Sequence, residues 1–207
     1  VQNYFEVDQK LGDWMDVGEL VKHKTLMADV VLNHCSVKSP WFIGYQNGDP
    51  LYENFFCTVS EDFDISNIVR PRSSSLKEKF LVNGEERNIW CTFSSDQADL
   101  NFKNPKVLQK LIDVIFWYIE MGVRVFRLDA VAFIWKTAGT SGLNAPQAHL
   151  IVRLLRILVE FVDRGIILIT ETNLPVHENL SYFGNGNEAH WIYNFTLPPL
   201  SIFTLIF

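Results

Sequence analysis

Apolar residues along this chain follow two patterns: short, nearly continuous runs and longer segments with helical spacing. The short runs cover residues 26–32, 123–128, 166–170 and 190–195. Apolar runs of this kind are typical of strands that are buried on both faces of a parallel sheet. We therefore predict four parallel strands at these positions.

Helical spacing marks the segments that separate these runs. Residues 17–25 form the first short helix of the prediction. Asn104-Pro105 predicts the start of a long helix, because Asn caps helices and Pro is tolerated in the first turn, and Gly122 ends it. A second long helix begins at Pro146 and closes at Gly165. Strands that alternate with helices in this way predict a parallel sheet covered by helices.

One long stretch, residues 36–103, breaks the alternation. Its short apolar pieces and turn signals, such as Asn83-Gly84, predict an irregular excursion with a few short strands. An excursion of this length is usually functional. We also predict a polar loop over residues 174–189. The predicted organisation is an inserted subdomain at 36–103 within a unit formed by residues 1–35 and 104–207.

Acidic residues end two of the predicted strands. The first run stops at Arg127-Leu128-Asp129, and the next stops at Glu171. A β/α barrel places its active site where parallel strands end. The predicted fold class is therefore α/β, a partial (β/α)8 TIM barrel containing about strands 3 to 6, with the subdomain inserted after strand 3. We expect the chain to be a fragment, because a complete barrel has eight strands and about 250 residues.

Composition and charge exclude several classes of partner. The net charge of −6 argues against a nucleic-acid partner, which would require clustered Lys and Arg. Cys35, Cys57 and Cys91 are odd in number and lack CxxC spacing, which argues against a disulfide framework or a zinc site and favours the cytoplasm. The apolar segment 200–207 is far shorter than the roughly 20 residues of a membrane span, so we predict no membrane association.

Two carboxylates at neighbouring strand ends suggest acid/base or nucleophilic chemistry. Enzymes that cleave glycosides use such a pair of carboxylates. Four motifs make the suggestion specific. They resemble signature regions of the α-amylase superfamily, glycoside hydrolase family 13, and read Asp29-Val-Val-Leu-Asn33-His34, Gln97-Ala-Asp99-Leu-Asn101, Gly122-Val-Arg-Val-Phe-Arg127-Leu-Asp129-Ala-Val, and the strand ending in Glu171.

Three further segments narrow this resemblance. Residues 130–141, 169–190 and 193–200 are similar to the sucrose phosphorylase branch, which includes glucosylglycerate and glucosylglycerol phosphorylases. Together the matching segments cover most of the chain. The resemblance implies retaining α-glucosyl transfer, with phosphorolysis of sucrose or a related α-glucoside to α-glucose 1-phosphate as the leading expectation.

The resemblance also implies roles for three charged residues. Asp129 would be the nucleophile and Glu171 the general acid/base of a double displacement through a covalent glucosyl-enzyme. Glu171 would require a raised pKa to protonate the leaving group. Arg127 lies two residues before Asp129 on the same face of its strand, where it would keep the nucleophile ionised and oriented.

Other residues of the motifs have implied roles beside this pair. His34 would hydrogen-bond a hydroxyl of the glucosyl unit, whereas Asp29 and Asn33 would brace the strand end. The implied small-molecule partners are an α-glucoside and inorganic phosphate, without a cofactor or metal. The family uses a third carboxylate from a His-Asp motif, which does not follow Glu171 here, so we expect this chain alone to be inactive.

Some side chains have two interpretations at this stage. Five aromatic residues are equally suited to sugar platforms and to core packing: Trp41, Phe55, Phe56, Trp90 and Trp191. Cys35 is more typical of a small buried filler than of a nucleophile. Lys136 and the turn Gly139-Thr140-Ser141 are candidates for the acceptor side, because barrel loops often carry function.

Three alternative functions remain open. The first is an α-glucoside hydrolase or transglucosidase of the same family, in which water or a sugar replaces phosphate. The second is a Mg²⁺-dependent enolase-type barrel, which Asp129 and Glu171 would suit but the adjacent Arg127 would oppose. The third is a non-catalytic sugar-binding relative, since a fold alone does not determine function.

Overall fold

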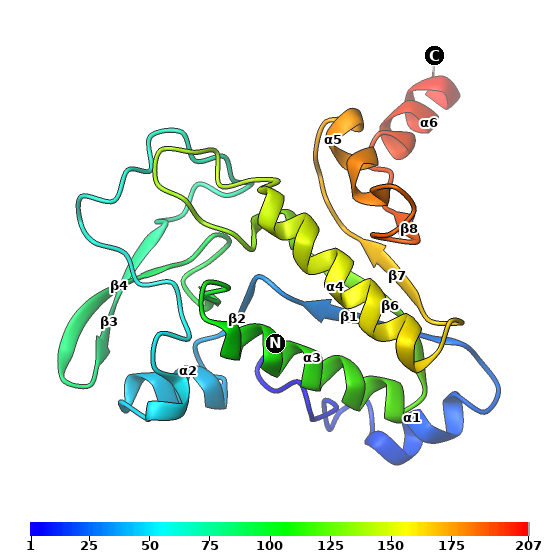
Figure 1. The fold of residues 1–207 in the computed structure, drawn as a ribbon, viewed down its shortest axis with the longest axis horizontal. Helices are drawn as coiled ribbons and strands as arrows, with labels where there is room; N and C mark the ends of the chain where they lie inside the picture. Colours follow the sequence, from blue (N-terminus) through cyan, green and yellow to red (C-terminus); the bar gives the residue numbers. More distant parts are fainter. Residues whose placement is uncertain (207) are drawn as a thin grey trace.

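The computed structural model describes residues 1–206 and is built around one parallel sheet (Figure 1). Four strands lie side by side in chain order, β1 (Leu26–Val31), β6 (Val123–Asp129), β7 (Ile167–Thr170) and β8 (Trp191–Ile192). Each neighbouring pair is parallel. The four predicted strands are thus confirmed, although β8 has two residues where the apolar run suggested six.

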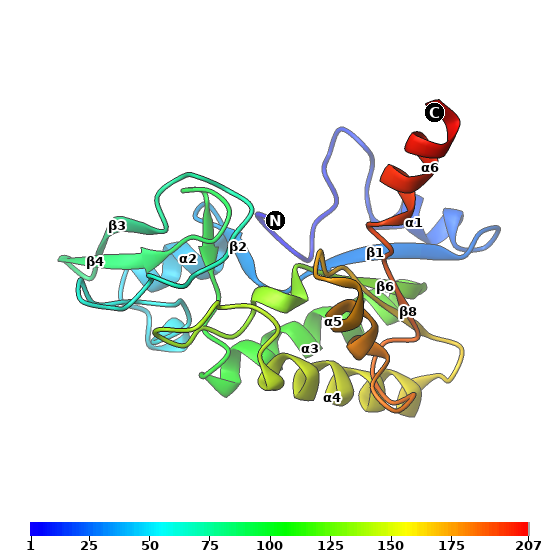
Figure 2. The ribbon, with the colours of Figure 1, turned by 90° about the horizontal axis from the view of Figure 1, so that it is seen from above.

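The two long helices lie on the same face of this sheet (Figure 2). α3 (Pro105–Glu120) precedes β6, and α4 (Pro146–Val162) connects β6 to β7. The strand order does not reverse and the helices share one face, which is how a β/α barrel is wound and a doubly wound sheet is not. The predicted α/β architecture is confirmed, and the described strands form an open arc of it.

Both long helices begin where the sequence predicts. The side chain of Asn104 accepts a hydrogen bond from the backbone N–H of Lys106 at 3.0 Å, and Pro105 occupies the first turn of α3. The helix buries one face in the core: Val107, Leu111, Val114, Ile115 and Ile119. Each fully buried side chain of this size contributes about 1.5–3 kcal/mol, so packing against the sheet holds the helix. α4 ends at Val162, three residues earlier than predicted, because Asp163 is extended.

The excursion is irregular, as predicted, with short strands and one short helix. It contains α2 (Pro40–Gln46), the 3₁₀ turn η1 (Pro50–Tyr52) and the antiparallel hairpin of β3 (Lys77–Val82) and β4 (Glu85–Trp90). The hairpin turns at Asn83-Gly84, where both residues have positive φ, as a tight two-residue hairpin requires.

The end of the excursion forms a separate two-stranded sheet with the segment that follows β1. β5 (Gln97–Asp99) pairs antiparallel with β2 (His34–Ser36), which places Asp99 opposite His34. Buried aromatic residues of the excursion, such as Phe42 and Phe56, join the same hydrophobic core as the sheet strands. The division at residues 36 and 103 stays a prediction.

Two further local predictions were wrong in their bounds. α1 spans Trp14–Leu20 instead of 17–25, because Asp13 and Asp16 form a capping box that starts the helix earlier. The predicted polar loop 174–189 contains α5 (Val176–Leu180) and the 3₁₀ turn η3 (Ser181–Phe183), which are too short to show a helical period in sequence.

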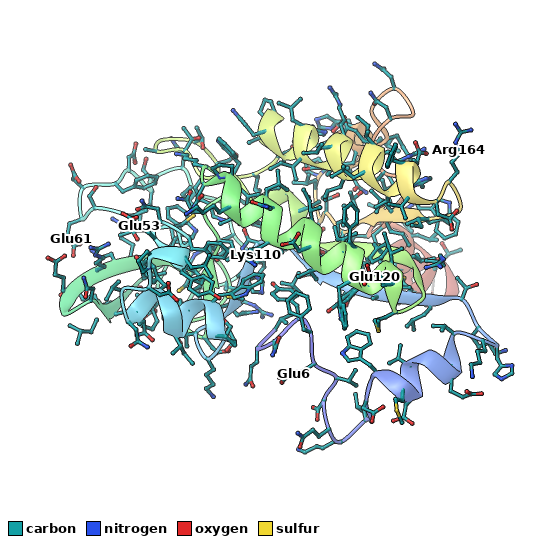
Figure 3. The ribbon with its side chains drawn as sticks, turned by 60° about the horizontal axis from the view of Figure 1, so that its bottom comes forward. Glu6, Glu53, Glu61, Lys110, Glu120 and Arg164 are labelled. Carbon is teal, nitrogen blue, oxygen red and sulfur yellow. The ribbon has the colours of Figure 1, made fainter. Side chains whose placement is uncertain are left out.

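The C-terminal apolar segment lies in α6 (Leu197–Ile206), except for Phe207, which is outside the described residues. No helix in the part of the chain that the structure describes is both long and apolar enough to cross a membrane. Charged side chains are spread over several elements in Figure 3, where the labelled ones are Glu6, Glu53, Glu61, Lys110, Glu120 and Arg164. In contrast, the charged side chains at the strand ends lie close to one another.

Candidate active site

The ends of three parallel strands bring the predicted catalytic residues together. Register aligns Asp29 of β1 with Arg127 of β6, and Asp129 lies two residues further along the same face. Glu171 follows β7, and its backbone N–H donates to the carbonyl oxygen of Leu128 at 3.1 Å. Adjacent strands therefore deliver the two acids to neighbouring positions at one edge of the sheet.

Arg127 is the centre of this group. Its Nη1 lies 3.0 Å from Oδ2 of Asp29 and 3.1 Å from Oδ1 of Asp129, and its Nη2 lies 4.0 Å from Oε1 of Glu171. The ring of Tyr193 lies 5.2 Å from the guanidinium carbon, a cation–π distance. The guanidinium is thus fixed from several sides and contacts all three acids.

The backbone after Asp129 links the two acids directly. Ala130 is left-handed, with φ of 53° and ψ of 29°, and its N–H donates to Oε2 of Glu171 at 3.1 Å. A left-handed residue other than glycine costs about 1 kcal/mol or more, and such strain concentrates at functional sites. No sequence pattern predicts this conformation at Ala130, because alanine is not typical of it.

The electrostatics of Asp129 differ from the expectation. Burial raises the pKa of Asp129 above its usual value, and the neighbouring Glu171 raises it further. Arg127 acts in the expected direction by lowering this pKa, but it does not outweigh the two opposing effects. The single positive charge of Arg127 therefore cannot neutralise all the carboxylates that surround it.

Asp129 and Glu171 line a pocket of about 490 Å³. Small-molecule sites usually enclose about 300–1,000 Å³, so the pocket suits a ligand of sugar size. Side chains from several segments complete its lining, namely His34, Val69, Arg70, Pro71, Arg72, Phe93, Gln97, Phe133, Leu143, Asn173 and Phe195. Sequence analysis missed Phe93, Arg70, Arg72 and Asn173, since they belong to irregular segments without a periodic pattern.

His34 forms one wall of the pocket. Its Nε2 lies 2.8 Å from the side-chain nitrogen of Gln97, and its ring lies 5.1 Å from that of Phe93. Burial lowers the pKa of His34 to about 4, although Asp99 acts in the opposite direction. The imidazole is therefore neutral at pH 7 and suited to hydrogen-bonding a neutral hydroxyl.

Asn33 and Lys136 lie beneath that wall rather than in the pocket. The Nζ of Lys136 donates to Oδ1 of Asn33 at 2.6 Å and pairs with Oδ2 of Asp99 at 2.7 Å. Lys136 is buried and does not line the pocket of the two acids, so a direct contact with an acceptor there stays without support. The turn at Gly139 contacts the excursion: its N–H donates to the carbonyl of Asp64 at 3.1 Å, and the carbonyl of Ser141 accepts from the N–H of Val69, which lines the pocket, at 2.9 Å.

Most of the aromatic residues with two interpretations pack in the core. Trp41, Phe55, Phe56 and Trp90 are buried in the hydrophobic clusters, whereas Trp191 is half-exposed but outside the pocket lining. Cys35 is fully buried, and burial raises the pKa of its thiol to about 12. Such a thiol does not serve as a nucleophile near neutral pH.

The acids at the strand ends are arranged around the guanidinium of Arg127. No group of three or more His, Cys, Asp or Glu side chains in the described residues is placed to hold a metal ion. The guanidinium of Arg127 lies between Asp29 and Asp129, where a cation shared by these acids would bind. This arrangement disfavours the Mg²⁺-dependent alternative.

Comparison with known proteins places this geometry in context. A family model described as the alpha amylase catalytic domain matches residues 1–204. The chain is 45% identical over 200 residues to a glucosylglycerate phosphorylase from Spirochaeta thermophila, covering 97% of this chain and 34% of that protein. It is 29% identical over 212 residues to a sucrose phosphorylase from Bifidobacterium adolescentis, covering 98% of this chain and 41% of that protein.

A solved structure shows the same fold. The sucrose 6F-phosphate phosphorylase from Thermoanaerobacter thermosaccharolyticum matches with a TM-score of 0.86 and 25% identity, covering 99% of this chain and 44% of that one. The chain spans about a third of the length of the glucosylglycerate phosphorylase and less than half of the length of the other two proteins.

Proposed function

The chain belongs to the alpha-amylase catalytic-domain family, and we propose that it carries the nucleophile and the acid/base of a retaining glycoside phosphorylase. The membership confirms the resemblance and the predicted partial barrel. The observation that carries the proposal is the arrangement of Asp129 and Glu171 around Arg127 in one pocket. The similarity to phosphorylases supports it.

The proposed reaction proceeds by double displacement. Asp129 attacks the anomeric carbon while Glu171 protonates the leaving oxygen, which gives a covalent glucosyl-enzyme and a free leaving group. Glu171 then accepts a proton from the incoming acceptor, which attacks the anomeric carbon and releases Asp129 as a carboxylate. Two inversions retain the α configuration. Arg127 orients Asp129, and His34 binds a glucosyl hydroxyl.

Phosphate is the proposed acceptor because of two arginines in the same pocket. Arg70 and Arg72 line it together with Asp129 and Glu171. Arg70 donates through Nη2 to the carbonyl of Ser74, and its Nη1 is buried with no hydrogen-bond partner among residues 1–206. Guanidinium groups recognise phosphate oxygens through charge-assisted hydrogen bonds, so this wall suits a phosphate better than a water molecule.

The proposed substrate is an α-glucoside with an acidic leaving group. The identity is 45% with a glucosylglycerate phosphorylase and 29% with a sucrose phosphorylase. A glycerate carboxylate and a phosphate would meet the same arginines in turn, since both are anions. Sucrose, with a neutral leaving group, is the second candidate. We place the enzyme in the cytoplasm, a reducing compartment in which Cys35, Cys57 and Cys91 remain free.

The test uses the full-length protein with glucosylglycerate or sucrose, with and without inorganic phosphate. The expected product is α-glucose 1-phosphate, identified as the α anomer by NMR before it equilibrates. Phosphate-independent release of glucose would favour the hydrolase instead. Failure to form glucose 1-phosphate from any α-glucoside would overturn the phosphorylase assignment.

Substitution of the arginines separates the acceptor from the donor. We expect Arg70→Ala and Arg72→Ala to lower the ratio of phosphorolysis to hydrolysis by about 10–100-fold, because one charge-assisted hydrogen bond contributes about 1.5–3 kcal/mol. The matched control is Arg164→Ala, which removes an exposed arginine outside the pocket. An unchanged ratio in both arginine variants would exclude these residues from phosphate binding.

A further inference from the structure

A second cation lies close to the pocket but does not face it. The side chain of Lys136 is 6% exposed, and that of its partner Asp99 is 0% exposed. Of the ion pairs that the described residues form, this one is the most deeply buried on both sides. The catalytic chemistry described above does not use either residue.

Lys136, Asn33 and Asp99 form a closed triangle. The ammonium lies 2.7 Å from Oδ2 of Asp99 and 2.6 Å from Oδ1 of Asn33, and Nδ2 of Asn33 donates to the same Oδ2 at 2.9 Å. Thr92 completes the environment of Asp99 by donating its backbone N–H to Oδ1 at 3.1 Å and its hydroxyl to Oδ2 at 2.5 Å. Both oxygens of Asp99 are therefore hydrogen-bonded.

The cost of this arrangement points to a purpose other than stability. Taking two charges out of water is costly, and well-packed apolar side chains often replace a buried ion pair without loss of stability. The three corners come from distant segments. Asn33 follows β1, Asp99 ends β5 in the excursion, and Lys136 follows the 3₁₀ turn η2 (Val131–Phe133) behind Asp129.

The triangle connects directly to the wall formed by His34. His34 follows Asn33 in the chain and pairs with Asp99 across the β2–β5 ladder. Gln97, two residues before Asp99, contacts Nε2 of His34 at 2.8 Å. A shift of Asn33 or Asp99 would therefore move both polar side chains of this wall.

We propose that Lys136 is a positioning residue for the glucosyl-binding wall of the pocket. Its ammonium fixes Asn33 and Asp99, and through them it sets the position of His34 and Gln97. The inference rests on the proposed function, because it assigns this wall to the glucosyl unit. Loss of the Lys136 ammonium should therefore lower kcat/KM for every glucosyl donor, regardless of which acceptor reacts in the second step.

The first test is Lys136→Ala in the full-length protein. We expect kcat/KM for the glucosyl donor to fall about 10–100-fold, the range seen when a side chain that orients a ligand-binding residue is removed. The ratio of phosphorolysis to hydrolysis should stay unchanged, because the acceptor wall with Arg70 and Arg72 is intact. Added methylammonium, which fits the space of the lost ammonium, should restore part of the rate, whereas tetramethylammonium should not.

The matched control is Lys103→Ala. Lys103 is exposed and lines the same small surface pocket as Lys136, so it reports on the loss of a nearby positive charge alone. We expect this variant to keep the wild-type kcat/KM. An equal loss in Lys103→Ala and Lys136→Ala would contradict the proposal.

A double variant separates positioning from folding. Asp99→Asn with Lys136→Met removes both buried charges at similar volume, so its melting temperature should stay near that of the wild type. We expect kcat/KM for the glucosyl donor to remain lowered in this folded variant. Wild-type kcat/KM per folded molecule in Lys136→Ala or in the double variant would overturn the proposal, as would loss of folding in both. If the proposed function itself is wrong, the wild-type protein will form no glucose 1-phosphate.

Discussion

Two clusters of cations and carboxylates lie on either side of His34. They differ in the ratio of positive to negative charges and in their exposure to solvent. At the strand ends, Arg127 contacts three acids, and two of them, Asp129 and Glu171, line a pocket of about 490 Å³. Behind His34, Lys136 and Asp99 form a one-to-one pair that is almost completely buried. The chemical groups are alike, but their surroundings are not.

The difference explains which carboxylate can react. In the open cluster, burial and Glu171 raise the pKa of Asp129, Arg127 contacts this carboxylate through Oδ1, and the side chain lines the pocket. In the closed cluster, both oxygens of Asp99 are held by Lys136, Asn33 and Thr92. The open cluster, with more carboxylates than cations, is suited to a catalytic role. The closed cluster, with one cation for one carboxylate, is suited to holding the surrounding segments in place.

Replacing the reactive acid should give the largest effect on activity. We expect Asp129→Asn to lower the rate of glucosyl transfer by about 10⁴-fold or more, as for other covalent nucleophiles. Because the folded-state pKa of Asp129 is raised, its ionisation opposes folding as pH rises above the ordinary value of 3.8. Thermal unfolding at pH 7 should therefore show no loss of stability, and activity assays should show almost no transfer.

Replacing the buried acid should give the opposite result. We expect Asp99→Asn to lower the free energy of unfolding by about 3–5 kcal/mol, because it leaves the buried ammonium of Lys136 without its anion. Urea titration of the full-length protein measures this loss. If Asp99→Asn were as stable as wild type while Asp129→Asn unfolded, the assignment of the two clusters would be reversed.

The wall between the clusters should respond to acid. Burial lowers the pKa of His34 from 6.5 to about 4, so between these values the unfolded chain binds more protons than the folded one. Stability is therefore fully present above pH 6.5 and falls as pH decreases toward 4. Unfolding free energies measured across this range should fall less steeply in His34→Gln. An identical slope in the variant would show that His34 does not ionise in this way.

The outermost acid should matter least. The side chain of Asp29 is 54% exposed, although its carboxylate lies 3.0 Å from Arg127. Exposed ion pairs contribute about 0–1 kcal/mol, so we expect Asp29→Asn to change kcat/KM by less than about tenfold. Steady-state kinetics at matched ionic strength measure the change. A loss as large as that of Asp129→Asn would assign Asp29 to the chemistry itself.

The sequence predicted the open cluster well because its geometry follows from regular elements. Apolar runs located the strands, their polar ends located Asp129 and Glu171, and the two-residue strand period located Arg127. The start of α3 at Asn104 could also be predicted, since helix capping depends on the local sequence.

The closed cluster and the acceptor wall could not be predicted in this way. The burial of Lys136 depends on the turn after β6, where Ala130 takes a left-handed conformation that no local pattern signals. Arg70 and Arg72 reach the pocket through an irregular segment held by long-range contacts, such as the hydrogen bond from the N–H of Val69 to the carbonyl of Ser141 at 2.9 Å. Contacts of this kind arise only from the complete fold.

Trapping the glucosyl-enzyme tests the central assignment most directly. A 5-fluoro-α-glucosyl fluoride carries a leaving group that needs no acid, so the full-length Glu171→Gln variant should still be glucosylated but turn over slowly. Peptide mass spectrometry should then find the fluoroglucosyl group on Asp129. A label on another residue, or no label from a donor that the wild-type enzyme consumes, would contradict the assignment of Asp129 as the nucleophile.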